Sequence, residues 1–143
     1  MRKYNFHDHK SVATPFDSSV HLFPVNNDDE IFNQKDYASI IGSLHYATDC
    51  TRLDIAYIVG VHSRFTSRPC RDHWLAIKRV MRYLIGTKSY GLFYKKHPAM
   101  IEAFSDADWN TLSGDSLSTI GYIFTLGSGA ICWKSKKQTT IAN

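Results

Sequence analysis

Two carboxylates lie two residues apart near the end of an apolar, strand-like run of this 143-residue chain. They are Asp106 and Asp108, within residues 104–109, which read FSDADW. Divalent cations such as Mg²⁺ prefer oxygen ligands on a rigid support, and a carboxylate at the end of a strand provides both. The pattern therefore indicates the beginning of a site for metal-dependent phosphoryl chemistry.

Such chemistry needs several converging carboxylates, because two metal ions about 4 Å apart must be held together. After Trp109 the sequence offers a single further acid, Asp115. Asp106, with or without Asp108, supplies too few ligands to bind such a pair of ions. We therefore expect no complete catalytic site, no metal site and no enzymatic activity, with Asp106 as a vestigial carboxylate.

Basic side chains are concentrated in one part of the chain. The segment 62–96 contains nine Lys or Arg residues and one acid, Asp72, so it carries a formal charge of +8, whereas the whole chain carries +4. Three of these residues, Lys78, Arg79 and Arg82, belong to a helix expected at residues 71–85 and lie mostly off its apolar stripe. This pattern is typical of a surface that weakly contacts nucleic-acid phosphates, although a solvated helix face would carry the same charges.

The composition, with 43% hydrophobic and 13% aromatic residues, is sufficient for a buried core and excludes global disorder. Cys50, Cys70 and Cys132 lack the spacing of a zinc or redox motif, which favours reduced thiols in an intracellular setting. The first ten residues lack the apolar core of a signal peptide, and no apolar run is long enough to span a bilayer. We expect an intracellular protein without a cofactor.

The chain should contain three helices followed by an antiparallel sheet, which is an α+β fold. Three regions are expected: an irregular segment at 1–35, a three-helix unit at 36–87 and a sheet at 88–143. The helices should span 36–50, with Asp36 as N-cap, then 53–65 and 71–85, with Gly86 as a C-cap glycine.

The strands should span residues 91–94, 101–104, 118–126 and 130–134, with a hairpin turn at 127–129 and residues from 136 onward leaving the sheet. We expect no helix after these strands to cover the sheet. One apolar face should therefore stay exposed.

The sequence blocks of this chain resemble Ty1/copia-type retrotransposon Pol polyproteins. Residues 37–46 (YASIIGSLHY) and 51–57 (TRLDIAY) are similar to the family's Y-x-x-x-V-G-S-L-x-Y and T-R-P-D-I-A-Y blocks. Residues 73–87, 105–109 and 133–138 continue the match, which covers nearly the whole chain.

The resemblance implies a fragment from the junction of reverse transcriptase and ribonuclease H. Residues 37–87 would correspond to the thumb and connection region, and 91–143 to the first strands of an incomplete ribonuclease H-like sheet. Asp106 would align with the first catalytic carboxylate of ribonuclease H, whose intact form uses Mg²⁺. The polymerase carboxylates and the later ribonuclease H carboxylates are expected to be absent, which implies a non-catalytic remnant. Leu53 departs from the family, which usually carries proline there.

Similar fragments also occur among predicted oomycete secreted effectors of the RxLR type. This implies an alternative role in virulence: secretion, delivery into a host cell and action on a host protein partner, for example in modulating plant cell death. The chain contains no Arg-x-Leu-Arg string, and the nearest approach, at residues 79–82, fails at Met81.

Overall fold

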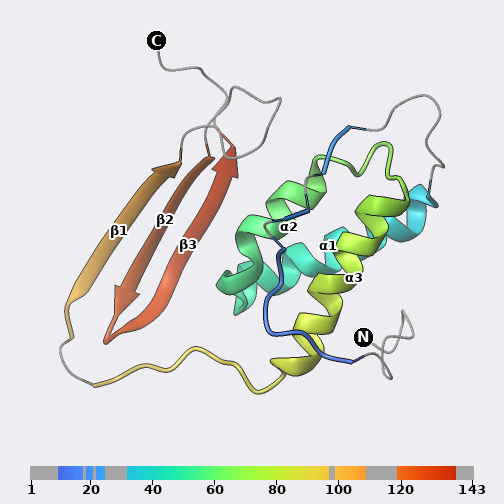
Figure 1. Cartoon of the computed structure of the whole chain (residues 1–143). Coiled ribbons are helices and arrows are strands. Elements are labelled where there is room, and N and C mark those ends of the chain that lie inside the picture. The colour runs from blue at the N-terminus through green and yellow to red at the C-terminus, as the bar shows by residue number, and fades with distance from the viewer. Residues whose placement is uncertain are drawn as a thin grey trace, which may run out of the picture.

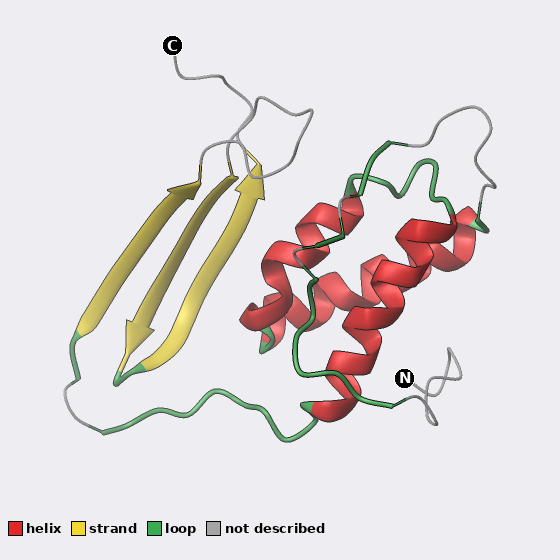
Figure 2. Ribbon diagram, viewed as in Figure 1, coloured by secondary structure: helices red, strands yellow, loops and turns green. Residues whose placement is uncertain are grey.

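The computed structural model describes residues 10–17, 19–20, 22–24, 32–96, 99–108 and 119–137. This part contains α1 (Gln34–Cys50), the 3-10 helix η2 (Leu53–Ile55), α2 (Ala56–Ser63), α3 (Arg71–Gly86), β1 (Ile101–Asp108), β2 (Thr119–Leu126) and β3 (Gly129–Lys137). The helices cluster beside an antiparallel sheet in the order β1-β2-β3, with β3 nearest to them (Figure 1). Figure 2 shows the helical and strand regions separated along the chain, so the predicted α+β class is confirmed.

The N-cap of the first helix is Asn33, and the prediction of Asp36 was wrong. Asn33 Oδ1 accepts hydrogen bonds from the backbone N–H groups of Lys35 (3.0 Å) and Asp36 (3.4 Å). Asn is as good a cap as Asp, and the residues after it are good helix formers, so the helix starts earlier. Asp36 instead lies in the first turn, where its negative charge favours the positive end of the helix dipole.

The second predicted helix, residues 53–65, is shorter than the sequence indicated. It begins with the 3-10 turn η2, and α2 ends at Ser63. Arg52 binds the carboxylate of Asp54 through Nε (2.9 Å to Oδ1) and Nη2 (2.7 Å to Oδ2), which holds this first turn together. Beyond α2 the N–H of Phe65 donates to the carbonyl three residues back, so the chain continues in turns of 3-10 type.

The third helix agrees with its predicted span to within one residue, but Gly86 is its last residue and not its C-cap. Thr87 is the C-cap, and its N–H donates to the carbonyl of Tyr83 (3.0 Å). A Cβ atom on Gly86 would lie 2.9 Å from Ser11 Cβ. Glycine at this position therefore makes room for the N-terminal part of the chain.

The predicted apolar faces of the helices meet in one core. Residues at helical spacing in the sequence, apolar except for His62, predict the inner faces of the first two helices, and all of these residues are buried: Tyr37, Ile40, Ile41, Leu44, Ile55, Ile58, Val59 and His62. From α3, Ile77, Met81 and Leu84 are buried as predicted, whereas Trp74 is half-buried and stacks on Phe32 with ring centroids 4.2 Å apart. Each large apolar side chain removed from water contributes about 1.5–3 kcal/mol, so this core is the main support of the helices.

Residues 10–17, 19–20 and 22–24, here called the strap, run along the helices without forming a helix or a strand (Figure 1). Phe16 packs edge-on against Tyr57 of α2, with ring centroids 6.4 Å apart. The carbonyl of Phe23 lies 3.0 Å from Nε2 of the buried His73 in α3. For the described residues, the expected irregular segment is therefore packed on the surface of the helical unit.

The predicted hairpin turn is confirmed, but the strand predicted at residues 91–94 is not formed. Gly127 and Ser128 have φ of 56° and 66°, as two-residue turns between antiparallel strands require. Lys95 N donates to Gly127 O (2.8 Å), and Tyr94 Oη donates to Ala130 O (2.7 Å). The chain around Tyr94 and Lys95 therefore crosses the hairpin turn at Gly127 and Ser128. It does not run alongside a strand, so no ladder of hydrogen bonds forms.

The sheet has one face toward the helices and one toward solvent. Ile123 pairs with Trp133, whose Nε1 donates to Thr48 O of α1 (2.8 Å). On the opposite face of β2, apolar side chains remain 38–40% exposed: Ile120, Tyr122, Phe124 and Leu126. The predicted exposed apolar face is thus confirmed in the described strands.

The last strand is longer than predicted. β3 continues to Lys137, and Lys136 pairs with Ile120. Lysines on an edge strand oppose pairing with other chains, because their charges would have to be buried.

None of the helices in the described residues combines the length and apolar character that crossing a membrane requires.

Candidate nucleic-acid interface

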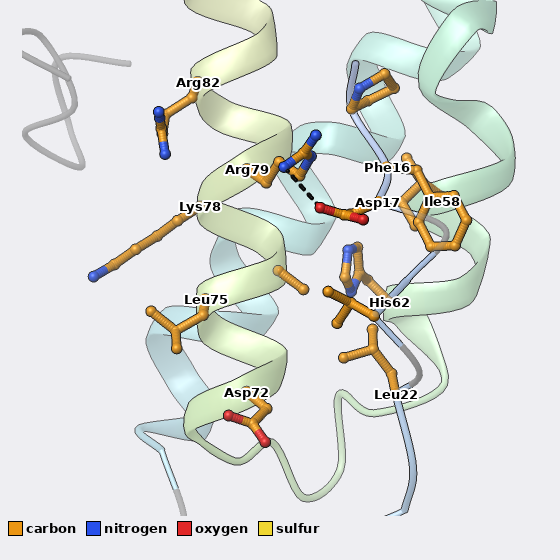
Figure 3. A pocket seen from close by; sticks show the side chains of 13 residues that line it. Phe16, Asp17, Leu22, Ile58, His62, Asp72, Leu75, Lys78, Arg79 and Arg82 are labelled. Atoms are coloured by element: carbon orange, nitrogen blue, oxygen red, sulfur yellow. Dashed lines mark ion pairs between the residues drawn. The ribbon is translucent and has the colours of Figure 1, made fainter. Parts of the chain in front are cut away.

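Two of the three side chains predicted to contact nucleic acid bind the strap. Arg79 donates from Nε to Thr14 O (3.2 Å) and from Nη2 to Thr14 Oγ1 (2.9 Å), and its Nη1 lies 3.2 Å from Asp17 Oδ2. Arg82 donates from Nε to Lys10 O (2.6 Å). Figure 3 shows Arg79 turned toward Asp17. The predicted residues share α3, but part of their hydrogen-bonding capacity is used within the chain.

The third side chain, Lys78, extends away from the strap (Figure 3). Its Nζ lies 5.6 Å from the centre of the Trp74 ring, which is a cation–π distance. Lys78 and Arg82 are four residues apart in α3, so they lie on the same side of the helix. This side of α3 offers two positive charges that a phosphate can approach from solvent.

The strap residues that meet Arg79 were not identified from the sequence. Hydrogen bonds from Ser19, foremost from its hydroxyl at 2.6 Å, lower the pKa of Asp17 below its ordinary value, and Arg79 adds a smaller effect. Asp17 is therefore ionised at neutral pH and faces a permanent cation. Thr14 is separated from Arg79 by 65 positions, and no local sequence signal reports such a contact.

The predicted vestigial carboxylate, Asp106, is exposed on the helix-facing side of β1. It pairs with Gly121 of β2, which pairs with Ser135 of β3, so the row across the sheet brings no second charge beside it. A cavity of about 340 Å³ opens here between the sheet and the start of α2, and its lining includes Leu53, Tyr57 and Asp106.

The described residues around Asp106 do not fit a magnesium site. Within the described part of the chain, no group of three or more His, Cys, Asp or Glu residues could hold a metal ion. Asp108 belongs to β1, but its side chain and all of Asp115 lie outside the described residues. One carboxylate beside a glycine and a serine supplies too few ligands for a divalent ion. No metal-dependent step is assigned to this site.

Known proteins similar to this chain include transposon polyproteins. The retrovirus-related Pol polyproteins from transposon RE2 of Arabidopsis thaliana and transposon TNT 1-94 of Nicotiana tabacum are 43% and 37% identical over 130 and 147 residues. These matches cover 90% and 99% of this chain, which spans 9% and 11% of the two polyproteins.

A second kind of relative is the secreted RxLR effector protein 161 of Plasmopara viticola. It is 47% identical over 107 residues, which is 74% of this chain and 75% of that protein. No family model matches the chain, and no solved structure matches it significantly. The similarity to the polyproteins extends over most of the chain, so this chain is homologous to a segment of retrovirus-related Pol polyproteins from copia-type transposons.

Proposed function

We propose that this chain is a non-catalytic remnant of a copia-type Pol polyprotein, from the junction of reverse transcriptase and ribonuclease H, that retains weak binding to the backbone of RNA or DNA. The observation that carries the proposal is the basic segment 62–96, of which Lys78, Arg79 and Arg82 lie on one helix. The polyprotein relatives support the origin of the fragment. Phosphate contacts position a duplex without reading its bases, so no sequence preference is expected.

Binding is expected to be weak because the arginines already bind the strap. A phosphate must displace Thr14 and Asp17 from Arg79 or use the guanidinium donors that remain, since arginine has five N–H donors in a fixed geometry. Lys78 and Arg82 are approached more directly. The affinity should fall as the salt concentration rises, with a modest slope because only a few phosphates are neutralised.

Fluorescence anisotropy with a labelled RNA–DNA hybrid tests this function. Between about 50 and 300 mM salt, we expect the logarithm of the binding constant to fall against the logarithm of salt with a slope of about −2 to −3, set by two or three phosphates. The triple variant Lys78→Gln, Arg79→Gln and Arg82→Gln should lose most of the binding. Lys134→Gln, on the exposed sheet surface, is the matched control. An affinity insensitive to salt, or a folded triple variant with wild-type affinity, rejects the proposal.

The absence of catalysis is tested separately. The purified chain, incubated with an RNA–DNA hybrid and Mg²⁺ or Mn²⁺, should release no more product than the variant Asp106→Asn. The reason is that Asp106 is the one carboxylate that the resemblance assigns to the chemistry, and two-metal hydrolysis requires several. Cleavage by the wild-type chain that Asp106→Asn abolishes would contradict the proposal.

An alternative function is favoured by the 47% identity to a secreted RxLR effector protein. In this alternative the chain is secreted, delivered into a host cell and acts there on a protein partner, whereas the remnant proposed above remains intracellular. Expression of the intact chain in plant tissue, scored for altered cell death, tests it. If a protein partner is responsible, the triple variant of α3 should alter cell death as the wild-type chain does. If the wild-type chain leaves cell death in the tissue unchanged, the alternative is rejected.

A further inference from the structure

A cavity of about 590 Å³ lies between the strap, α2 and α3 (Figure 3). Its apolar lining comes from all three segments: Phe16 and Leu22 from the strap, Ile58 from α2, and Leu75 and Ala76 from α3. Ligand sites for small molecules have volumes of about 300–1,000 Å³, mostly apolar walls and a few polar groups. Neither the basic side of α3 nor Asp106 explains this cavity.

One polar side chain is aimed into this cavity and has no partner there. His62 is 1% exposed, and Figure 3 shows its ring directed into the cavity beside Ile58 and Leu22. Its Nδ1 is buried and lacks a hydrogen-bond partner among the described residues. Burial, with a smaller effect from His73, lowers the pKa of His62 to about 4, so the ring is neutral at physiological pH. Nδ1 has almost no surface open to the cavity, so a ligand atom reaches it after a small rotation of the ring, and the hydrogen bond then recovers the free energy that this unsatisfied group forfeits.

The charges around the cavity restrict the charge of an occupant. Lys78, Arg79 and Arg82 line it together with Asp17 and Asp72, which gives a formal charge of +1; Arg79 is paired with Asp17, and the Lys78 side chain extends away from the strap at the rim. This balance favours a neutral or singly anionic ligand over a cation. A lone water is a poor occupant beside His62, because a buried water needs two to four polar partners and the neighbouring Leu22, Ile58 and Leu75 supply apolar side chains.

We propose that this cavity binds a small phenolic compound, neutral or singly anionic, whose hydroxyl group hydrogen-bonds His62 Nδ1. The aromatic ring would contact Leu22, Ile58 and Leu75, which present apolar surface from three segments. A phenolic hydroxyl both donates and accepts, so it satisfies Nδ1 in either neutral tautomer of the histidine. The ring is rigid, so little conformational entropy is lost on binding.

Three probes of similar size test the proposal on the full chain: 4-hydroxyphenylacetate, phenylacetate and tyramine. Calorimetry should give a dissociation constant about fivefold lower for 4-hydroxyphenylacetate than for phenylacetate, which corresponds to one neutral hydrogen bond. Tyramine, a cation, should bind more weakly than 4-hydroxyphenylacetate. The His62→Phe variant should bind the two carboxylates equally. Equal affinities for these carboxylates in the wild-type chain would overturn the proposal.

A second variant and a direct measurement test the proposal even if the His62→Phe variant does not fold. Ala76→Phe fills the cavity from α3 and should abolish binding of all three probes, whereas Tyr46→Phe, on the exposed surface of α1, should leave it unchanged. In the wild-type chain, 4-hydroxyphenylacetate should shift the ¹⁵N NMR signal of His62 Nδ1. The absence of any shift at millimolar probe, or undiminished binding in a folded Ala76→Phe variant, refutes a phenol site here.

Discussion

Arg52 connects the start of the second helical segment to the end of the third. Its Nη2 donates to Thr87 Oγ1 (2.6 Å), and its guanidinium also holds Asp54, which accepts from Tyr83 Oη (2.7 Å). Burial alone raises the pKa of Asp54, but the bonds from Arg52 and Tyr83 outweigh it and hold this pKa below its ordinary value. The stability that this carboxylate contributes is therefore present above its unfolded pKa and is lost as the pH falls through the folded pKa.

His62 should make the stability of the fold depend on pH in a higher pH range than the carboxylate of Asp54 does. Its pKa is about 4 in the folded chain and 6.5 as its ordinary value, so between these values the unfolded chain binds a proton that the folded chain does not. Stability should therefore fall by about 3 kcal/mol from pH 7 to pH 4 through this residue. Urea unfolding at both pH values should show this loss in the wild-type chain and a smaller one in His62→Phe.

The control for His62 is His45→Phe, which changes an exposed histidine on α1. Its free energy of unfolding should change with pH as the wild-type value does. If His62→Phe shows the same difference between pH 7 and pH 4 as the wild-type chain, the assignment of this pH dependence to His62 is wrong.

The positions of the helices follow from local patterns, but their ends depend on particular contacts. Apolar residues at helical spacing predicted the buried faces correctly, because that spacing reports burial directly. The first helix begins at Gln34 because Asn33 supplies the cap, and α3 includes Gly86 because the N–H of Thr87 still donates to the carbonyl of Tyr83. The segment 91–94 has strand-like composition but crosses a turn, and composition alone does not show where a chain segment will lie.

The cap of α1 offers a quantitative test at this scale. Asn33→Ala should reduce the free energy of unfolding by about 1 kcal/mol, because two backbone N–H groups lose their acceptor. Asp36→Ala should cost less, since it loses mainly the interaction with the helix dipole. Asp49→Ala, near the opposite end of α1, should be neutral or slightly stabilising. Urea unfolding of the three variants measures these differences, and an equal or larger loss in Asp36→Ala would restore the sequence-based assignment of the cap.

The contact between Gly86 and the strap predicts a local effect. A methyl group at Gly86 would lie 2.9 Å from Ser11 Cβ, closer than such atoms approach in proteins. Gly86→Ala should therefore displace the strap while α3, which gains helix propensity, remains folded. Trypsin should cut after Lys10 several-fold faster in this variant, with unchanged helical circular dichroism. Adding Ser11→Gly should restore the wild-type rate, and failure to restore it would show that another contact is responsible.

At the scale of the whole molecule, the sheet relies on the helices. A three-stranded sheet is stable when it buries a hydrophobic face or packs against a helix, and here the outer face of β2 leaves apolar side chains partly in water, so burial falls to the face that meets the helices. The placement of Lys78, Arg79 and Arg82 on one helix was predictable from helical period, whereas their role in binding stays a prediction. Their partners Thr14 and Asp17 were not, because such pairings arise only when the chain folds back on itself. The same holds for the bond from Trp133 to Thr48, which spans 85 positions.

That bond predicts how the two regions separate. Trp133→Phe keeps an aromatic ring against the helices but removes the donor to Thr48 O, which should cost about 1 kcal/mol. The loss should appear mainly in the sheet, because the helical core has its own buried apolar residues. Hydrogen exchange should therefore accelerate at the amides of β2 and β3 and stay unchanged in α1. Trp74→Phe, which alters the ring stacked on Phe32, is the matched control and should leave sheet exchange unchanged. If Trp133→Phe accelerates exchange equally in α1 and β2, the helices and the sheet unfold as one unit, and the picture of a sheet supported by an independent helical core is wrong.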